Sequence, residues 1–371
     1  KNVQKLNLGS NQISDISSLG ELRNLRELDL RHNRIRNITA LGKLTKLETL
    51  CLYDNPISDI RAVAKLTKLR RLELWTNQIT DISPLSKLTN LEALELGANR
   101  ISDISPLRGL TNLGGLDLYK NQISDITPLN ELTHLGSLSL GANQISDLRP
   151  LSKLTNLHYL ELHENQISDI SPLRKLTRVS WLYLWHNQVK DITALSELTG
   201  LQELSLRSNQ ISDVSPLSKL TNLKTLELHG NRITDISPLT GLTNLQRLIL
   251  HGNRVSDISP LGELKNMQSL SLGANRIGDI SPLCALTNLE QLSLDDNRIS
   301  DITALRELTK LEELHLRDNR ISDITPLVSN PRVGERDTVD LRGNPLSEHS
   351  VNNLVPQLEQ RSVGVRYDKP K

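Results

Sequence analysis

Aromatic side chains are the groups in this chain best suited to contact another molecule, and they are few and regularly placed. The sequence of 371 residues has three Trp, five Tyr and no Phe. All but Tyr367 alternate with Leu in short segments, which predicts half-buried β-strands that carry the aromatic rings on their exposed face. Exposed clusters of Trp and Tyr are typical of binding surfaces. The seven residues are Tyr53, Trp75, Tyr119, Tyr159, Trp181, Tyr183 and Trp185.

Charged residues accompany these aromatic residues and form a first predicted patch with three of them. Glu73, Glu95 and Asp117 follow one another at intervals of 22 residues. Carboxylates on adjacent strands repel one another, so stability alone would not select them. We expect these carboxylates to bind a basic group of a partner or, alternatively, a hard cation. The simpler interpretation is that they form a solvated acidic face that binds nothing. The aromatic members of this patch are Tyr53, Trp75 and Tyr119.

A second predicted patch centres on Trp181, Tyr183 and Trp185, which point the same way from one strand. The alternative interpretation is that cross-strand aromatic pairs only stiffen the sheet, by about 0.2–1 kcal/mol each. The residues expected beside them are Tyr159, Glu161 and His163 on one neighbouring strand, and Glu203, Ser205 and Arg207 on the other.

Motifs for catalysis, cofactors and metals are missing from the sequence. It contains no G-x-x-x-x-G-K, G-x-S-x-G or H-E-x-x-H segment. His229 and His251, with Glu227 nearby, lack a third fixed metal ligand. We therefore expect no enzymatic activity, no cofactor and no metal site.

Charge and hydropathy exclude two further classes of partner. There are 44 basic and 43 acidic side chains, a formal net charge of +1, which argues against nucleic-acid binding through bulk charge. No run of 18 apolar residues occurs, so no membrane insertion is expected.

Cys51 and Cys284 are too far apart to pair, and free thiols favour a reducing compartment.

An exact repeat must position all these residues. Asn recurs every 22 residues from Asn11 to Asn319, and Asn344 follows after 25. Around Asn99 the repeat reads LTNLEALELGANRISDISPLRGL. Its alternating Leu residues predict one short strand, which must stack in parallel on its neighbours to bury its apolar face. The Asn amide is expected to satisfy backbone groups of the following turn, and Asp103 to cap a short helical turn that contains Pro106.

This repeat resembles the leucine-rich repeat family, specifically the 22-residue class of internalin-like bacterial proteins and phosphatase-regulator-type proteins. The resemblance implies an α/β fold: a right-handed solenoid, or horseshoe, with a parallel β-sheet on the concave face and short 3₁₀ segments on the convex face. It covers nearly the whole chain and implies about sixteen repeats within residues 1–346.

Residues 347–371 are expected to form a C-terminal cap, because a terminal repeat would otherwise expose its core. We expect Ser347 to be the N-cap of a helix that Pro356 splits, and Val363, Val365 and Tyr367 to form a last strand. Lys1 already lies inside a repeat, so we expect a missing upstream cap and fraying of the first repeats.

Localisation stays open, since free cysteines favour the cytoplasm whereas internalin-like proteins are secreted or displayed on the cell surface.

We therefore expect a non-enzymatic scaffold that binds a protein partner on its concave face. The alternatives are a carbohydrate-binding module and a regulatory subunit that docks on an enzyme. A glycan site needs one compact patch, whereas a protein footprint of about 800 Å² spans several repeats. The aromatic residues extend from Tyr53 to Trp185, which favours a protein partner.

Overall fold

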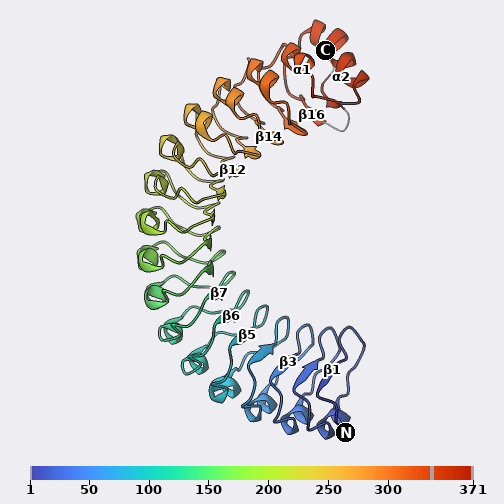
Figure 1. The fold of residues 1–371 in the computed structure, drawn as a ribbon, viewed down its shortest axis with the longest axis vertical. Coiled ribbons are helices and arrows are strands. Elements are labelled where there is room, and N and C mark those ends of the chain that lie inside the picture. Colours follow the sequence, from blue (N-terminus) through green and yellow to red (C-terminus); the bar gives the residue numbers. More distant parts are fainter. Residues whose placement is uncertain (1, 335–337, 369–371) are drawn as a thin grey trace. The chain divides into compact units, whose positions relative to one another are not determined.

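The computed structural model of the chain describes residues 2–334 and 338–368. Lys1 and residues 369–371, which the expected first repeat and C-terminal cap include, lie outside the described residues. The chain divides into two compact units, Lys1–Asn187 and Gln188–Lys371. Within each unit the strands lie on the inner side of the curve and the short helices on the outer side (Figure 1).

The strands of the first unit form a parallel ladder in chain order, in which each strand pairs with the next. The register places each central Leu opposite the next, as Leu94 opposite Leu116. The repeat length of 22 residues sets this register, since it brings the same position of each repeat side by side. The strands are β1 (Lys5–Asn7), β2 (Glu27–Asp29), β3 (Thr49–Cys51), β4 (Arg71–Glu73), β5 (Ala93–Glu95), β6 (Gly115–Asp117), β7 (Ser137–Ser139), β8 (Tyr159–Glu161) and β9 (Trp181–Tyr183).

The second unit repeats this arrangement with its own parallel ladder. Its strands are β10 (Glu203–Ser205), β11 (Thr225–Glu227), β12 (Arg247–Ile249), β13 (Ser269–Ser271), β14 (Gln291–Ser293), β15 (Glu313–His315), β16 (Thr338–Asp340) and β17 (Gly364–Arg366).

Short 3₁₀ helices return the chain on the outer side of each unit, as the Ser-Pro-Leu segments predict. Asp103 accepts a hydrogen bond from the backbone N–H of Ser105 (2.8 Å), which confirms its expected capping role. In the first unit these helices are η1 (Ser17–Glu21), η2 (Thr39–Lys43), η3 (Arg61–Lys65), η4 (Ser83–Lys87), η5 (Ser105–Leu107), η6 (Thr127–Leu129), η7 (Arg149–Lys153) and η8 (Ser171–Lys175). In the second unit they are η9 (Thr193–Glu197), η10 (Ser215–Leu217), η11 (Ser237–Leu239), η12 (Ser259–Glu263), η13 (Ser281–Ala285) and η14 (Thr303–Glu307).

Leu and Ile fill the space between the strands and the outer helices. In the repeat that contains β5, Leu94, Leu96, Ile101, Ile104 and Leu107 have no exposed surface. Each such side chain contributes about 1.5–3 kcal/mol of burial free energy, and the contribution recurs in every repeat. The core therefore needs no aromatic residue, which leaves the aromatic residues for the strand face.

The Asn column is structural, as expected. Asn121 is buried, and its side-chain Nδ2 donates to the carbonyl oxygens of Leu118 (3.1 Å) and Tyr119 (3.3 Å) in its own turn. The same amide also connects two repeats, because Nδ2 donates to the carbonyl of Leu96 (3.1 Å) and Oδ1 accepts from the N–H of Ile101 (3.0 Å). Each such Asn thus satisfies buried backbone groups of two consecutive turns.

The residue before each of these asparagines adopts a left-handed backbone conformation, which the sequence analysis did not predict. Its φ is +51° at Ala98, +53° at Ala142 and +52° at Glu164, whereas Gly occupies the equivalent positions 230 and 252. Non-Gly residues are strained there, by about 1–2 kcal/mol each. The hydrogen bonds of the Asn ladder hold them in place.

The C-terminal segment agrees with the expected helix and strand, with one correction. The hydroxyl of Ser347 accepts a hydrogen bond from the backbone N–H of Ser350 (3.1 Å), as an N-cap does. Pro356 does not split the helix. The helix widens into a π-helical turn, η15 (Ser350–Leu354), and continues as α2 (Val355–Gln360), because a wider turn accommodates the missing N–H of Pro356.

Two further elements complete this end of the second unit. α1 (Thr325–Ser329) takes the place of a 3₁₀ helix, and α2 packs against β17 and α1. β17 pairs with β16, so the expected last strand is confirmed at Gly364–Arg366. The boundary at residue 346 between solenoid and cap stays a prediction.

Candidate binding surface

Each repeat presents three side chains to the strand face. They are the first strand residue, the third strand residue, and the residue two positions later, which we call the first, second and third rows. In the repeat of β5 they are Ala93, Glu95 and Gly97. Third-row residues therefore lie past the ends of the strands. This corrects the expectation for six residues that were predicted within strands: Tyr53, Trp75, Tyr119, His163, Trp185 and Arg207.

Aromatic rings run along the third row of the first unit. Tyr53 packs against Trp75 with ring centroids 6.5 Å apart and nearly perpendicular planes, and the Arg31 guanidinium lies 5.8 Å from the Tyr53 ring centre. Further along the row, His163 is buried and stacks on Trp185, with centroids 4.1 Å apart and planes at 12°. These contacts fix the orientation of rings that the sequence analysis assigned to two separate patches.

Two glycines of the third row make room for these rings. A β-carbon at Gly97 would overlap Cδ1 and Nε1 of Trp75, and one at Gly141 would stand 2.7 Å from Nε2 of His163. His163 thereby reaches across Gly141 toward Tyr119, at a centroid distance of 5.6 Å. We call the third row from Tyr53 to Trp185 the aromatic row. Its rings form two packed groups, Tyr53 with Trp75 and Tyr119 with His163 and Trp185, and Trp75 lies against Gly97 between them.

The second row carries the predicted acidic column. Glu73 lies opposite Glu95, and Glu95 lies opposite Asp117, in the register of adjacent strands. Arg71 of the first row, which the prediction omitted, bridges the first two carboxylates at 2.6 Å from Glu73 and 2.9 Å from Glu95. The buried Cys51 thiol donates a further hydrogen bond to Glu73 (2.8 Å). Repulsion is therefore relieved at the Glu73 end of the column.

Asp117 and Glu161 are held by neutral donors. Asp117 accepts a hydrogen bond from the backbone N–H of Tyr119 (2.8 Å). Glu161 accepts one from the Ser139 hydroxyl (2.6 Å) and another from the phenol of Tyr159. Desolvation raises the pKa of Asp117 above its usual value, with a further contribution from the negative charge of Glu161, while the Tyr119 N–H opposes the rise.

Glu95 and Tyr159 of this surface also have shifted pKa values. Burial, followed by the charge of Glu73, raises the pKa of Glu95, and Arg71 offsets part of that rise. Burial and the hydrogen bond to Glu161 raise the pKa of the Tyr159 phenol. Carboxylates in this region are therefore less well solvated than ordinary surface carboxylates.

A hollow of about 620 Å³ lies on the strand face between Arg71 and Tyr159. Its floor is low because the first row carries only small residues there: Ala93, Gly115 and Ser137. We call it the acidic hollow, since three carboxylates and one Arg line it. Its other polar and aromatic lining residues are Trp75, Glu95, Asp117, Tyr119, Ser139, Tyr159, Glu161 and His163.

The predicted second patch divides between the two units. Its first-unit residues come together, since Tyr159 and Tyr183 pack with centroids 5.8 Å apart and Trp181 is 39% exposed. Arg207 belongs to the second unit, as do Glu203 and Ser205. The first-unit part of the second predicted patch therefore adjoins the first patch through the contact of His163 with Tyr119, and its role in binding stays a prediction.

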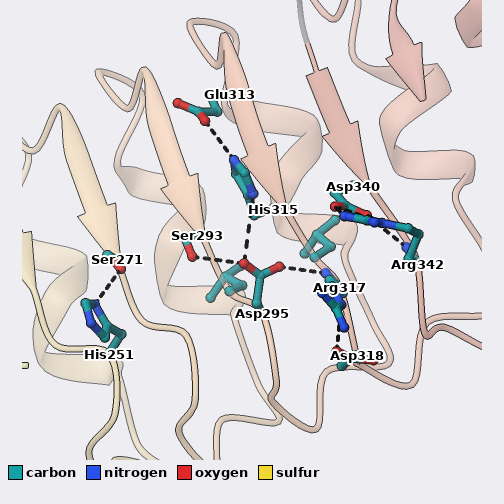
Figure 2. A network of polar contacts seen from close by, with 12 residues as sticks. His251, Ser271, Ser293, Asp295, Glu313, His315, Arg317, Asp318, Asp340 and Arg342 are labelled. Carbon is teal, nitrogen blue, oxygen red and sulfur yellow. Dashed lines mark hydrogen bonds and ion pairs between the residues drawn. The ribbon is translucent and has the colours of Figure 1, made fainter. Parts of the chain in front are cut away.

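The strand face of the second unit carries a polar network instead of aromatic rings, which the sequence analysis missed (Figure 2). His315 contacts Glu313 at 2.8 Å and Asp295 at 3.9 Å. Asp295 also accepts a hydrogen bond from the backbone N–H of Arg317 (2.8 Å). The Arg317 guanidinium forms an ion pair with Asp318 (2.8 Å). The alternation of acidic residues with His and Arg in consecutive repeats is the sequence feature that could have predicted it.

The described residues bear on two expected absences. Within residues 2–334 and 338–368, no group of three or more His, Cys, Asp or Glu side chains is arranged to hold a metal ion. His229 and His251 stack on each other, with centroids 4.3 Å apart. In the same part of the chain, no helix has the length and apolar character needed to cross a membrane.

Comparison with known proteins settles the family. A family profile described as Leucine Rich repeats (2 copies) matches the chain repeatedly between residues 1 and 329. The chain belongs to the leucine-rich repeat family. The matched stretches of this leucine-rich repeat protein are residues 1–43, 45–87, 67–110, 89–131, 111–153, 133–175, 177–219, 199–241, 243–285 and 287–329.

Solved structures place this leucine-rich repeat protein near the internalins. It is similar to an internalin (inlF) of Listeria monocytogenes, with 38% identity and a TM-score of 0.70 over 83% of this chain and 85% of the other. It is also similar to a leucine-rich repeat protein of Leptospira interrogans, with 25% identity and a TM-score of 0.88 over 98% and 95% of the two chains. No curated protein matches by sequence.

A third similarity concerns the fold alone. The extracellular repeat domain of the Arabidopsis receptor kinase HAESA, solved in complex with an extended IDA peptide hormone, is 21% identical with a TM-score of 0.76. The match covers 98% of this chain and 66% of that one. Leucine-rich repeat proteins are commonly scaffolds for protein–protein interaction and typically not enzymes.

Proposed function

We propose that this protein is a non-enzymatic scaffold that binds a protein partner on the strand face of its first unit. The aromatic row from Tyr53 to Trp185, with its two groups of packed rings, carries the proposal. It crosses seven repeats at a strand spacing of about 4.8 Å, so it extends for roughly 30 Å. This length is close to the width of a protein interface that covers about 800 Å² on each partner.

The aromatic row also has the composition expected of a binding surface. Rings that pack on glycine and on one another are held in fixed orientations, so little conformational entropy is lost when a partner covers them. Trp75 of this row and Trp181 of the first row keep 38% and 39% of their surface exposed although the core does not need them. Large, oriented and exposed aromatic residues are the usual anchors of protein interfaces.

A carbohydrate ligand is the second candidate, and one observation favours it. The acidic hollow is compact, and Trp75 and Tyr159 line it together with carboxylates that could hydrogen-bond sugar hydroxyls. The aromatic row extends beyond the hollow to Trp185, so a small glycan in the hollow would leave Trp185, and Trp181 of the first row, uncovered. The protein partner therefore accounts for more of the surface.

A pull-down tests the proposal. The intact chain and a Tyr53→Ala, Trp75→Ala variant serve as baits, and His229→Ala, His251→Ala is the control that disrupts a stacked pair in the second unit. We expect proteins retained by the intact chain and by the control to be lost with the first variant. Equal retention by all three baits would contradict the proposal. If the retained protein is an enzyme whose activity changes on binding, the regulatory-subunit alternative gains support.

A further inference from the structure

We propose that the acidic hollow binds a basic side chain, arginine or lysine, of the protein partner. This inference rests on the proposed function and deepens it, because it assigns a chemical class to the part of the partner that enters the hollow. The juxtaposition that carries it is a pair of carboxylates, Asp117 and Glu161, placed among aromatic rings over a floor of small residues.

Charge is the first argument. Glu95, Asp117 and Glu161 line the hollow, and Arg71 is the cation that faces them there. Arg71 is already shared between Glu73 and Glu95. The donors to Asp117 and Glu161, in contrast, are a backbone N–H, a serine hydroxyl and a phenol, none of which carries charge. The hollow therefore keeps an excess of negative charge that an incoming cation would compensate.

Desolvation is the second argument. A carboxylate on an open face is stabilised by water, but Asp117 and Glu95 are partly desolvated by burial in a hollow that Trp75, Tyr119 and Tyr159 also line. An ion pair or charge-assisted hydrogen bond formed in such a place is stronger than one formed on an open surface. A cation that enters the hollow gains more from Asp117 than it would from an ordinary surface carboxylate.

Shape is the third argument. A volume of about 620 Å³ lies within the range of about 300–1,000 Å³ typical of ligand pockets, so a long side chain with its flanking backbone can enter. A β-carbon added at Gly115 would meet no atom within 4 Å, so space above the floor is open. Tyr119 and Tyr159 line the hollow, and aromatic rings attract a guanidinium or ammonium group.

Other occupants fit less well. An anionic group would face uncompensated carboxylates, and among the described residues no cluster is arranged to coordinate a metal ion. A neutral sugar would leave the charge of Asp117 and Glu161 without a counter-charge. The excess of carboxylate in the hollow selects a basic group.

The test uses two synthetic peptides and isothermal titration calorimetry with the full chain near neutral pH. One peptide contains two arginines in a Gly-Ser background, and the other carries citrulline at the same positions. Citrulline has nearly the shape of arginine without its charge. We expect the arginine peptide to bind at least about tenfold more tightly, as the loss of one charged hydrogen bond predicts. Equal affinity of the two peptides, or no heat of binding from either, would overturn the proposal.

Variants locate the effect. Asp117→Asn keeps the acceptor for the Tyr119 N–H and removes the charge, and Asp117→Asn combined with Glu161→Gln removes both charges. The matched control is Glu227→Gln. Glu227 is a second-row carboxylate of the second unit and accepts a hydrogen bond from the Ser205 hydroxyl (2.9 Å), as Glu161 accepts one from Ser139. We expect the Asp117 variants to lose the preference for arginine over citrulline and the control to keep it. A preference that survives in the Asp117 variants would place the basic group elsewhere.

A third variant provides a test that leaves every charge in place. Gly115→Val adds volume to the floor of the hollow, and we expect it to weaken binding of both peptides. Unchanged binding would show that the peptides do not enter the hollow. If arginine selectivity fails while Tyr53→Ala, Trp75→Ala still abolishes capture of the protein partner, the inference falls and the proposed function stands.

Discussion

The indole ring of Trp75 lies over the α-carbon of Gly97 in the next repeat, where a β-carbon would overlap Cδ1 and Nε1 of the ring. The same relationship joins His163 to Gly141. A glycine beside an aromatic residue lets the ring lie along the sheet instead of standing away from it. The strand face of the first unit is therefore built from pairs of repeats, not from single repeats.

Replacing Gly97 by Ala is expected to displace Trp75 and to weaken partner binding by about 1–2 kcal/mol, because the ring would lose its fixed orientation. The fluorescence of Trp75, isolated by replacing the other two Trp residues with Phe, reports the displacement. Gly114→Ala is the control, since the nearest atom to an added β-carbon there is 3.7 Å away. An unchanged Trp75 spectrum in the Gly97→Ala protein would contradict the packing relationship.

Trp181→Ala combined with Trp185→Ala is expected to weaken partner binding by at least about 2 kcal/mol, as for hot-spot residues. Stability should fall only by about 0.5–1.5 kcal/mol, because the main packing lost is the stacking of Trp185 on His163. Binding is measured by calorimetry and stability by urea unfolding. A protein that binds normally but loses several degrees in melting temperature would show that these rings serve the structure alone.

Asn165→Ala is expected to cost about 1–3 kcal/mol in the free energy of unfolding, since it leaves buried backbone groups of two turns without partners. The Asn165 side chain donates to Leu140 and Leu162 and accepts from Ile145 at 2.9–3.1 Å. Asn90→Ala is the matched control, because the exposed Asn90 amide donates to a single carbonyl, that of Thr67. Urea unfolding of both variants checks the difference, and equal stabilities would refute the structural role of the ladder.

Ala98→Gly and Ala142→Gly are expected to stabilise the protein, each by up to about 1 kcal/mol, because Gly adopts a positive φ without steric cost. The reverse change, Gly252→Ala at φ +66°, should destabilise it by a similar amount. Thermal unfolding measures all three variants. A loss of stability in both Ala→Gly variants would mean that the entropy of Gly in the unfolded chain outweighs the relief of strain.

Asp103 and Asp257 on the outer side, and Asp117 on the strand face, are expected to have pKa values shifted in opposite directions. The backbone and side-chain hydrogen bonds from Ser105 lower the pKa of Asp103, and equivalent contacts lower that of Asp257. The stability that these two contribute is present above the ordinary Asp pKa and is lost as the pH falls through their lowered values. Carbon-13 NMR titration of the carboxyl groups measures each pKa directly.

Asp117 behaves in the opposite way, because its raised pKa means that ionisation opposes folding. Its contribution to stability rises as the pH falls through that raised value. Binding of the arginine peptide should weaken over the same range, since protonation removes the charge that attracts it. The titratable groups that interact with Asp117 include Glu95, Glu161 and the phenol of Tyr159. An Asp117 pKa below that of Asp103 would contradict both assignments.

The amino-acid sequence by itself determined the repeat and what it must do. Its 22-residue period brings equivalent positions side by side, so the parallel strands, the Leu and Ile core and the Asn ladder follow from one repeat. The placement of Glu73, Glu95 and Asp117 in one column follows in the same way. These features depend only on spacing and on the need to bury apolar groups, which the chain specifies locally.

Only the tertiary structure decided how the strand face is shaped. Arg71 bridges Glu73 and Glu95, and His163 reaches over Gly141, because long side chains cross between repeats in directions that spacing does not define. The acidic hollow exists where small first-row residues lie between Arg71 and Tyr159. The shape of this hollow depends on the sizes and rotamers of side chains in several adjoining repeats at once. The repeat pattern therefore predicts which residues lie on the strand face but not the shape that they form together.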